Sequence, residues 1–166
     1  MRQKVYVTDA NVWNDLKAAD LLKETFELPI QFITPDVILE ELLELDGKKV
    51  VSLGLVSRGL SGEGVAQVSR LRGERRYRSL STPDLFALVL TEREGLSLLT
   101  GDAKLRKIAE EDGVLVRGTL WLLDELVRLK IISPQRGAEA IEDMLRKDRR
   151  LPRLECDRRL QQWRLR

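Results

Sequence analysis

Several acidic residues lie where short apolar runs end or where helical patterns begin. Asp9 follows the run at 4–8, Asp102 follows the run at 96–100, and Asp84 is in the first turn of a predicted helix. Glu40 and Glu41 lie one turn into another predicted helix. Carboxylates packed together repel one another, and a divalent cation relieves that repulsion. Hard oxygen ligands favour Mg²⁺ or Mn²⁺, and such sites are typical of phosphoryl-transfer chemistry.

The rest of the composition excludes many other kinds of catalysis. The 166-residue chain has no His, which excludes a Ser-His-Asp or Cys-His catalytic set and an imidazole zinc ligand. Its single cysteine, Cys156, excludes a disulfide within the chain and a CxxC metal site. Enzymatic chemistry would therefore have to come from carboxylates, hydroxyls, Lys, Arg or a bound cofactor.

Each acid also has a purely structural interpretation. Asp is among the best N-cap residues, and acidic side chains favour the first turn of a helix. Taken singly, Asp9, Asp84 and Asp102 fit helix caps better than metal ligands. Glu40 and Glu41 fit a solvated helix face. Only the joint occurrence of the acids favours a metal site.

The elements that would position these acids alternate along the chain. Predicted strands and helices take turns, which is typical of one α/β domain with a parallel sheet covered on both faces. We interpret the following apolar runs as strands: 4–8, 30–33, 50–56, 96–100 and 114–116. In parallel sheets with right-handed crossovers, every strand-to-helix junction lies at the same edge. Ligands bind beyond that edge, so distant acids are expected to meet there.

Some element boundaries are predicted from specific residues. Leu16, Ala19, Leu22 and Phe26 follow a helical spacing that predicts one helix before Pro29. Thr34-Pro35-Asp36 predicts a helix start with Pro at the first helical position, and Gly47 is expected to end that helix. Residues 118–166 are expected to form about three helices.

Four short segments together resemble the ordered motifs of PIN-domain nucleases. They are Val7-Thr8-Asp9-Ala10-Asn11-Val12, Leu39-Glu40-Glu41-Leu42, Leu80-Ser81-Thr82-Pro83-Asp84 and Leu99-Thr100-Gly101-Asp102-Ala103-Lys104-Leu105. The resemblance implies a three-layer α/β/α sandwich with a central, mainly parallel sheet. It covers 1–117 as the nuclease core, with 118–166 as a basic helical extension of the same domain.

The resemblance also implies a site and an activity. Asp9, Glu41, Asp84 and Asp102 would hold Mg²⁺ or Mn²⁺ as catalytic metal ligands, with Asn11 and Thr100 as supporting polar groups. The implied activity is an endoribonuclease that leaves a 5′-phosphate and a 3′-hydroxyl. Many single-domain relatives are toxins neutralised by an antitoxin protein, and pairing of two chains into a homodimer is also implied.

The glutamate ligand is open between two neighbours. Adjacent residues point roughly 100° apart on a helix, so only one of Glu40 and Glu41 can face the site. In the family the acid is commonly followed by Leu, which favours Glu41.

Two basic clusters suggest a polyanion partner, which the resemblance identifies as RNA. Residues 58–78 contain six Arg and two Glu, and residues 146–166 contain nine basic and three acidic residues. Such clusters suit phosphate contacts, although each could equally be a solvated helix face. Charged residues interrupt the N-terminal stretch and no run approaches the ~20 apolar residues of a membrane span, so a cytoplasmic setting is expected.

Three other functions compete with the nuclease. An RNA-binding or protein-interaction module on the same fold would do no chemistry. A phosphotransfer receiver domain would need an Asp at the end of its third strand, where Ser57-Arg58 stands. A P-loop enzyme would need GxxxxGK[ST], which the sequence does not contain.

Overall fold

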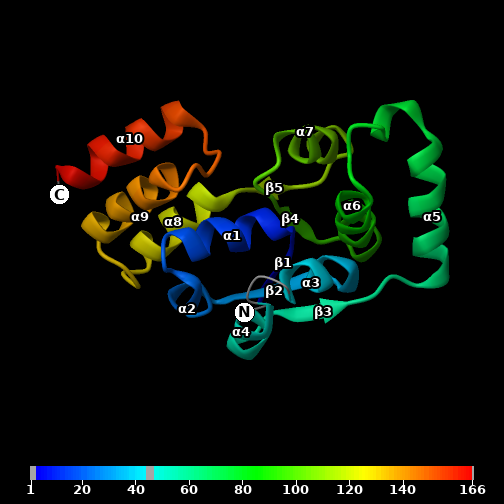
Figure 1. Ribbon diagram of the computed structural model, residues 1–166, viewed down its shortest axis with the longest axis horizontal. Helices are drawn as coiled ribbons and strands as arrows, with labels where there is room; N and C mark the ends of the chain where they lie inside the picture. Colours follow the sequence, from blue (N-terminus) through cyan, green and yellow to red (C-terminus); the bar gives the residue numbers. More distant parts are fainter. Residues whose placement is uncertain (1–2, 44–46, 166) are drawn as a thin grey trace.

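Five parallel strands form the central sheet of the computed structural model, which describes residues 3–43 and 47–165 (Figure 1). The spatial order is β3-β2-β1-β4-β5, and the pairs in this order are parallel. The strands are β1 (Lys4–Thr8), β2 (Ile30–Pro35), β3 (Val56–Arg58), β4 (Ser97–Leu99) and β5 (Val116–Arg117).

Helices cover both faces of this sheet. The chain moves from β1 to β3 in one direction and returns to β4 and β5 in the other, and right-handed crossovers place the two sets of helices on opposite faces. The first set contains α1 (Ala10–Ala18), α2 (Leu22–Thr25), α3 (Asp36–Leu43) and α4 (Gly47–Leu53). The second contains α5 (Gly62–Gly73), the 3-10 helix η1 (Arg75–Tyr77), α6 (Thr82–Glu94) and α7 (Ala103–Glu111). The predicted α/β/α sandwich is confirmed, and α6 packs on β1, β2 and β4.

The carboxyl ends of the strands lie at one edge, as the topology requires. Thr8 pairs with Leu99 at the ends of β1 and β4, and the hydroxyl of Thr34 on β2 donates to the Thr8 carbonyl at 3.1 Å. Beyond these strands the amide of Thr100 donates to the Arg117 carbonyl at 3.0 Å. The junctions after β1, β4 and β5 are therefore held side by side.

The segment 50–56 is a helix followed by a short strand, so its interpretation as one strand was wrong. Periodicity alone cannot separate a short apolar run in a helix from one in a strand. Gly54 has a φ of 126°, its amide bonds to Val51, and the Leu55 amide bonds to Val50. These are the two bonds of a Schellman helix ending, which requires this backbone at the residue after the helix. Gly47, predicted to end a helix, is the first residue of α4.

Two other boundaries also differ from the prediction. The helix expected to continue to Pro29 is broken at Asp20, which has a φ of 52° and separates α1 from α2. Leu16, Ala19 and Leu22 are still buried on both sides of this break. Pro35 is the last residue of β2 rather than the first of α3.

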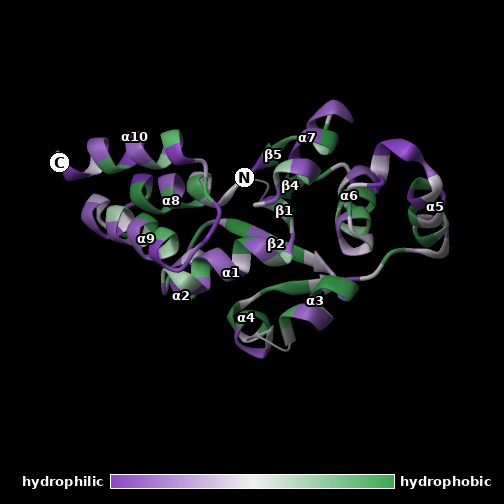
Figure 2. Cartoon of the chain, turned by 45° about the horizontal axis from the view of Figure 1, so that its top comes forward, coloured by the Kyte–Doolittle hydropathy of each residue, from purple (hydrophilic) through white to green (hydrophobic). Residues whose placement is uncertain are grey.

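Three further helices pack beside the sandwich: α8 (Thr119–Arg128), α9 (Pro134–Arg146) and α10 (Arg153–Arg164). α9 lies against α1, α8 and α10. Gly137 makes the α9–α10 approach possible, because a Cβ there would lie 3.0 Å from both Trp163 and Val127. Figure 2 shows that β2 is mostly hydrophobic whereas α10 is mostly hydrophilic on its outer side. Among the described helices, none is both long and apolar enough to cross a membrane.

Candidate active site

Asp9 is a buried acid at the edge where the strands end. It caps α1, and its Oδ1 accepts from the Val12 amide at 3.1 Å. Only 3% of the residue is exposed. Burial raises the pKa of its carboxyl to about 6, and the negative charge of Asp84 adds to this rise while the hydrogen bond from Thr100 opposes it. A carboxyl with this pKa carries its charge at neutral pH against a desolvation cost.

Thr100 connects Asp9 to the loop that follows β4. Its buried hydroxyl donates to Oδ2 of Asp9 and accepts from the Asp102 amide at 3.0 Å. The Gly101 amide donates to the same Asp9 oxygen at 3.3 Å. Two donors from one loop therefore orient the Asp9 carboxylate and stabilise its charged form.

Asp84 and Asp102 lie at the starts of two other helices. Asp102 caps α7 by accepting from the Leu105 amide at 2.8 Å through Oδ1. Asp84 is the third residue of α6 and shares a capping box with Ser81, in which the Ser81 amide donates to Asp84 Oδ2 at 2.9 Å. Both acids are half-buried. The structural interpretation of all three aspartates as capping residues is therefore correct, and it is compatible with a second role.

The α3 glutamates are less constrained than the aspartates. Glu40 and Glu41 are both exposed on α3, and the geometry does not choose between them. Asn11 is exposed in the first turn of α1, where its side chain could still reach a ligand. Within the described residues no three carboxylates are close enough to hold one metal ion together. The fold brings Asp9, Asp84 and Asp102 to one edge, and the two glutamates are exposed on α3.

Asp15 is a buried acid of this region that sequence reasoning did not select. Only 2% of it is exposed, and it accepts from Thr119 Oγ1 at 2.7 Å and from Arg149 Nε at 2.6 Å. Burial raises the pKa of its carboxyl, and both bonds oppose that rise. A Cβ on Gly101 would lie 3.5 Å from its Oδ2, so Asp15 lies next to the loop that carries Thr100. The sequence feature that could have pointed to Asp15 was its position one helical turn after Asn11, on the same face of α1.

A family model described as a PIN domain matches residues 5–164 of the chain. The chain belongs to the PIN-domain family. Its structure is similar to a PilT N-terminus domain protein from the hyperthermophilic archaeon Sulfolobus solfataricus P2, with a TM-score of 0.51 and 13% identity. That similarity covers 72% of this chain and 91% of the other, and at this identity it concerns the fold. No curated protein matches the sequence. The PIN domain is a nuclease-type fold, and PIN domains typically use divalent metals.

The aspartates of this PIN domain have the donor chemistry that a hard divalent cation prefers. All are oxygen donors, and Asp9 is a desolvated carboxyl whose charge a cation would stabilise. The capping bonds among the described residues use Oδ2 of Asp84 and Oδ1 of Asp102, so each has a second oxygen for a ligand. The donor set therefore fits Mg²⁺ or Mn²⁺.

A cleft of about 1020 Å³ is lined by Asp102 but not by Asp9 or Asp84. It starts at Thr100 and Asp102, passes the start of α8, and continues to the linker at 148–152 and to α10. Its walls thus come both from the sheet edge and from the last helices of the PIN domain. This shape places a bound molecule next to Asp102.

Proposed function

We propose that this PIN domain is a metal-dependent endoribonuclease. The observation that carries the proposal is the environment of Asp9. It is a buried carboxyl held by Thr100 and Gly101, and the charge of Asp84 contributes to its raised pKa. Burial is the main cause of that raised pKa, and a bound cation would both stabilise the desolvated carboxylate and relieve its repulsion from Asp84.

In this proposal Asp9, Asp84 and Asp102 hold Mg²⁺ or Mn²⁺, with Glu41 as the fourth acid. The cation, when bound, lowers the pKa of a water and neutralises charge on the phosphodiester. Thr100 is a positioning residue, because it fixes the Asp9 carboxylate and the Asp102 amide with one hydroxyl. Asn11 lines the cleft beside Asp102, where it would orient the RNA or a water.

Asp9→Asn tests the proposal most simply. The amide oxygen of Asn can still accept the capping bond from the Val12 amide, so the α1 cap and the fold should survive while the charge is lost. Purified wild-type protein should cleave a labelled single-stranded RNA with Mn²⁺ or Mg²⁺ and stop in EDTA, and Asp9→Asn should be inactive. Asp157→Asn is the matched control, because Asp157 is an exposed acid on α10. Wild-type activity in EDTA, or an active Asp9→Asn variant, would reject the proposal.

The alternative is an RNA-binding module that does no chemistry. It is favoured by one observation: the described acids act as helix caps and do not group in threes around a metal position. RNA that binds wild-type protein and stays intact with every divalent cation tested would select this alternative. The toxin role, the antitoxin partner and the homodimer stay predictions. Growth arrest on expression of the wild-type protein, absent with Asp9→Asn, would support the toxin role.

A further inference from the structure

We propose that the cleft beside Asp102 binds one single-stranded segment of RNA and leads it to the acids. This inference rests on the proposed function for the identity of the polyanion. The cleft is continuous with the site, because Thr100, Gly101 and Asp102 form its first wall. The opposite wall is the 148–152 linker between α9 and α10. A strand bound between them would have a phosphodiester next to Asp102.

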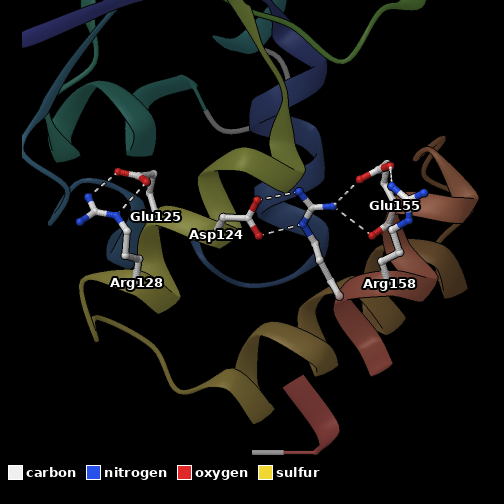
Figure 3. A network of polar contacts seen from close by, with 6 residues as sticks. Asp124, Glu125, Arg128, Glu155 and Arg158 are labelled. Carbon is white, nitrogen blue, oxygen red and sulfur yellow. Dashed lines mark hydrogen bonds and ion pairs between the residues drawn. The ribbon is translucent and has the colours of Figure 1, made fainter. Parts of the chain in front are cut away.

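Some cations of the cleft are neutralised by acids of the chain and serve to build it. Arg149 bonds to buried Asp15, which fixes the linker to α1. Arg159 donates to both oxygens of Asp124 at 2.8 and 2.6 Å and to Glu155 at 3.2 Å. Figure 3 shows Asp124 and Glu155 facing each other across this arginine, from α8 and α10. These bonds hold the far wall in place.

Other cations of the cleft are available to a ligand. Lys104 and Arg150 are exposed, and neither takes part in a hydrogen bond or ion pair with the described residues. Arg106 has only an exposed pair with Glu110 at 3.4 Å, which contributes little stability. Its guanidinium lies on Gly118, where a Cβ would be 2.8 Å from Nη2. Positive groups on both walls suit the phosphates of a nucleic-acid backbone.

The deep side of the cleft offers a surface for a base. The guanidinium of Arg117 lies over the ring of half-buried Trp121 at 5.9 Å from its centre. Both side chains line the cleft. Planar groups of this kind stack on unstacked bases, which a single strand presents.

Several arginines of the 58–78 stretch are bound to other parts of the chain. Arg58 pairs with Glu94, Arg72 donates to the Leu80 carbonyl, and Arg76 pairs with Asp112. These contacts tie β3 to α6, α5 to Leu80 and η1 to Asp112 at the end of α7. Figure 1 shows α5 at the opposite end of the molecule from α10. The structure thus favours the cleft over the 58–78 stretch as the path of the RNA.

Charge reversal in the two regions tests this inference by RNA binding alone. Lys104→Glu/Arg150→Glu removes cations from both walls of the cleft, and Arg70→Glu/Arg75→Glu makes the same charge change at exposed positions of α5 and η1. Both are made in the Asp9→Asn background, and the Kd of a fluorescein-labelled single-stranded RNA is measured in EDTA at several salt concentrations. The cleft pair should weaken binding by roughly tenfold or more and lower the salt slope by one to two. The α5 pair should change the Kd less than twofold.

Several outcomes would overturn the inference. They are an equal or larger loss of binding in the α5 pair, unchanged binding in the cleft pair, and wild-type binding of duplex RNA as tight as that of the single strand.

Gly118→Ala adds a milder test, because it displaces Arg106 without removing a charge. It should weaken binding more than Gly73→Ala, where the added Cβ has open space. Circular dichroism would verify folding of each variant. If the wild type cleaves RNA but the cleft pair binds RNA as tightly as before, the cleft proposal is wrong and the nuclease proposal stands. If binding depends on the cleft but the wild type does not cleave RNA, the nuclease proposal is wrong and the cleft proposal stands.

Discussion

The aspartates at the strand ends and the glutamates of α3 are held in different ways. Asp9 and Asp102 cap helices and share Thr100, so backbone amides fix both carboxylates. Glu40 and Glu41 are exposed on a helix surface and have long side chains. The difference teaches that capping and ligand binding are compatible at a strand end, where the chain direction fixes the side chain. On α3 a ligand position depends on the rotation of the helix.

The largest effect is expected at the capping aspartates. Asp102→Asn and Asp84→Asn should each lower RNA cleavage by 100- to 1000-fold, because they remove a charge that the cation needs. Asn caps a helix about as well as Asp at position 102, and at position 84 its amide oxygen can still accept from the Ser81 amide, so the melting temperature should be nearly unchanged. Cleavage rates and thermal melts of the same samples would check both parts. A large loss of stability with little loss of rate would show that these residues only cap.

The pH dependence of stability should separate Asp9 from an ordinary cap. Its folded pKa of about 6 lies above the ordinary value of 3.8, so protonation favours the folded state. This contribution is full below pH 3.8 and is lost as the pH rises through 6, and it amounts to roughly 3 kcal/mol. Urea unfolding of the metal-free protein from pH 4 to 7.5 should show this loss of stability as the pH rises. The Asp9→Asn variant should not show it, because it has no carboxyl at this position. Parallel curves for the two proteins would contradict the raised pKa.

Thr100→Val should have a smaller effect, on both stability and rate. The valine removes one of the three hydrogen bonds to Asp9 and leaves the Asp102 amide without its acceptor, which should cost about 1–3 kcal/mol of unfolding free energy. The lost bond should also raise the pKa of Asp9 further and move the pH midpoint of cleavage upward. Thr100→Ser keeps the hydroxyl and serves as the control. Two variants with the same midpoint would remove Thr100 from its positioning role.

The smallest effect is expected on α3, where the comparison is least settled. Glu41→Gln should lower cleavage by roughly tenfold, because an exposed, flexible acid contributes less charge stabilisation than a fixed one. Glu40→Gln should leave it unchanged, since the two side chains point to different sides of the helix. Steady-state rates at saturating Mn²⁺ would compare them. A tenfold loss in Glu40→Gln with no loss in Glu41→Gln would identify Glu40 as the ligand.

The sequence predicted the parts of the site that chain direction and local capping determine. Asp9 and Asp102 follow strands, and parallel topology alone brings them to one edge. Asp15 could not be found in this way, because its partner Arg149 is 134 residues away in a linker with no regular pattern. Nothing local indicates that this linker returns to α1.

The misassigned helix at 50–53 has a different origin. Gly54 followed by the apolar Leu55 is a Schellman signal that periodicity alone does not register. The break at Asp20 was also hidden, since Asp adopts a positive φ less readily than Gly. Periodicity therefore located the apolar faces correctly, and local hydrogen bonding decided where each helix ended.

The most direct test of the central claim is a calorimetric titration with Mn²⁺. At pH 7.5 the wild-type protein and the Asp157→Asn control should bind Mn²⁺ with a measurable heat, and Asp9→Asn should bind far more weakly. That result would show that the carboxylates at the strand ends form a cation site centred on Asp9. Equal binding by wild type and Asp9→Asn, or no binding by the wild type, would contradict it.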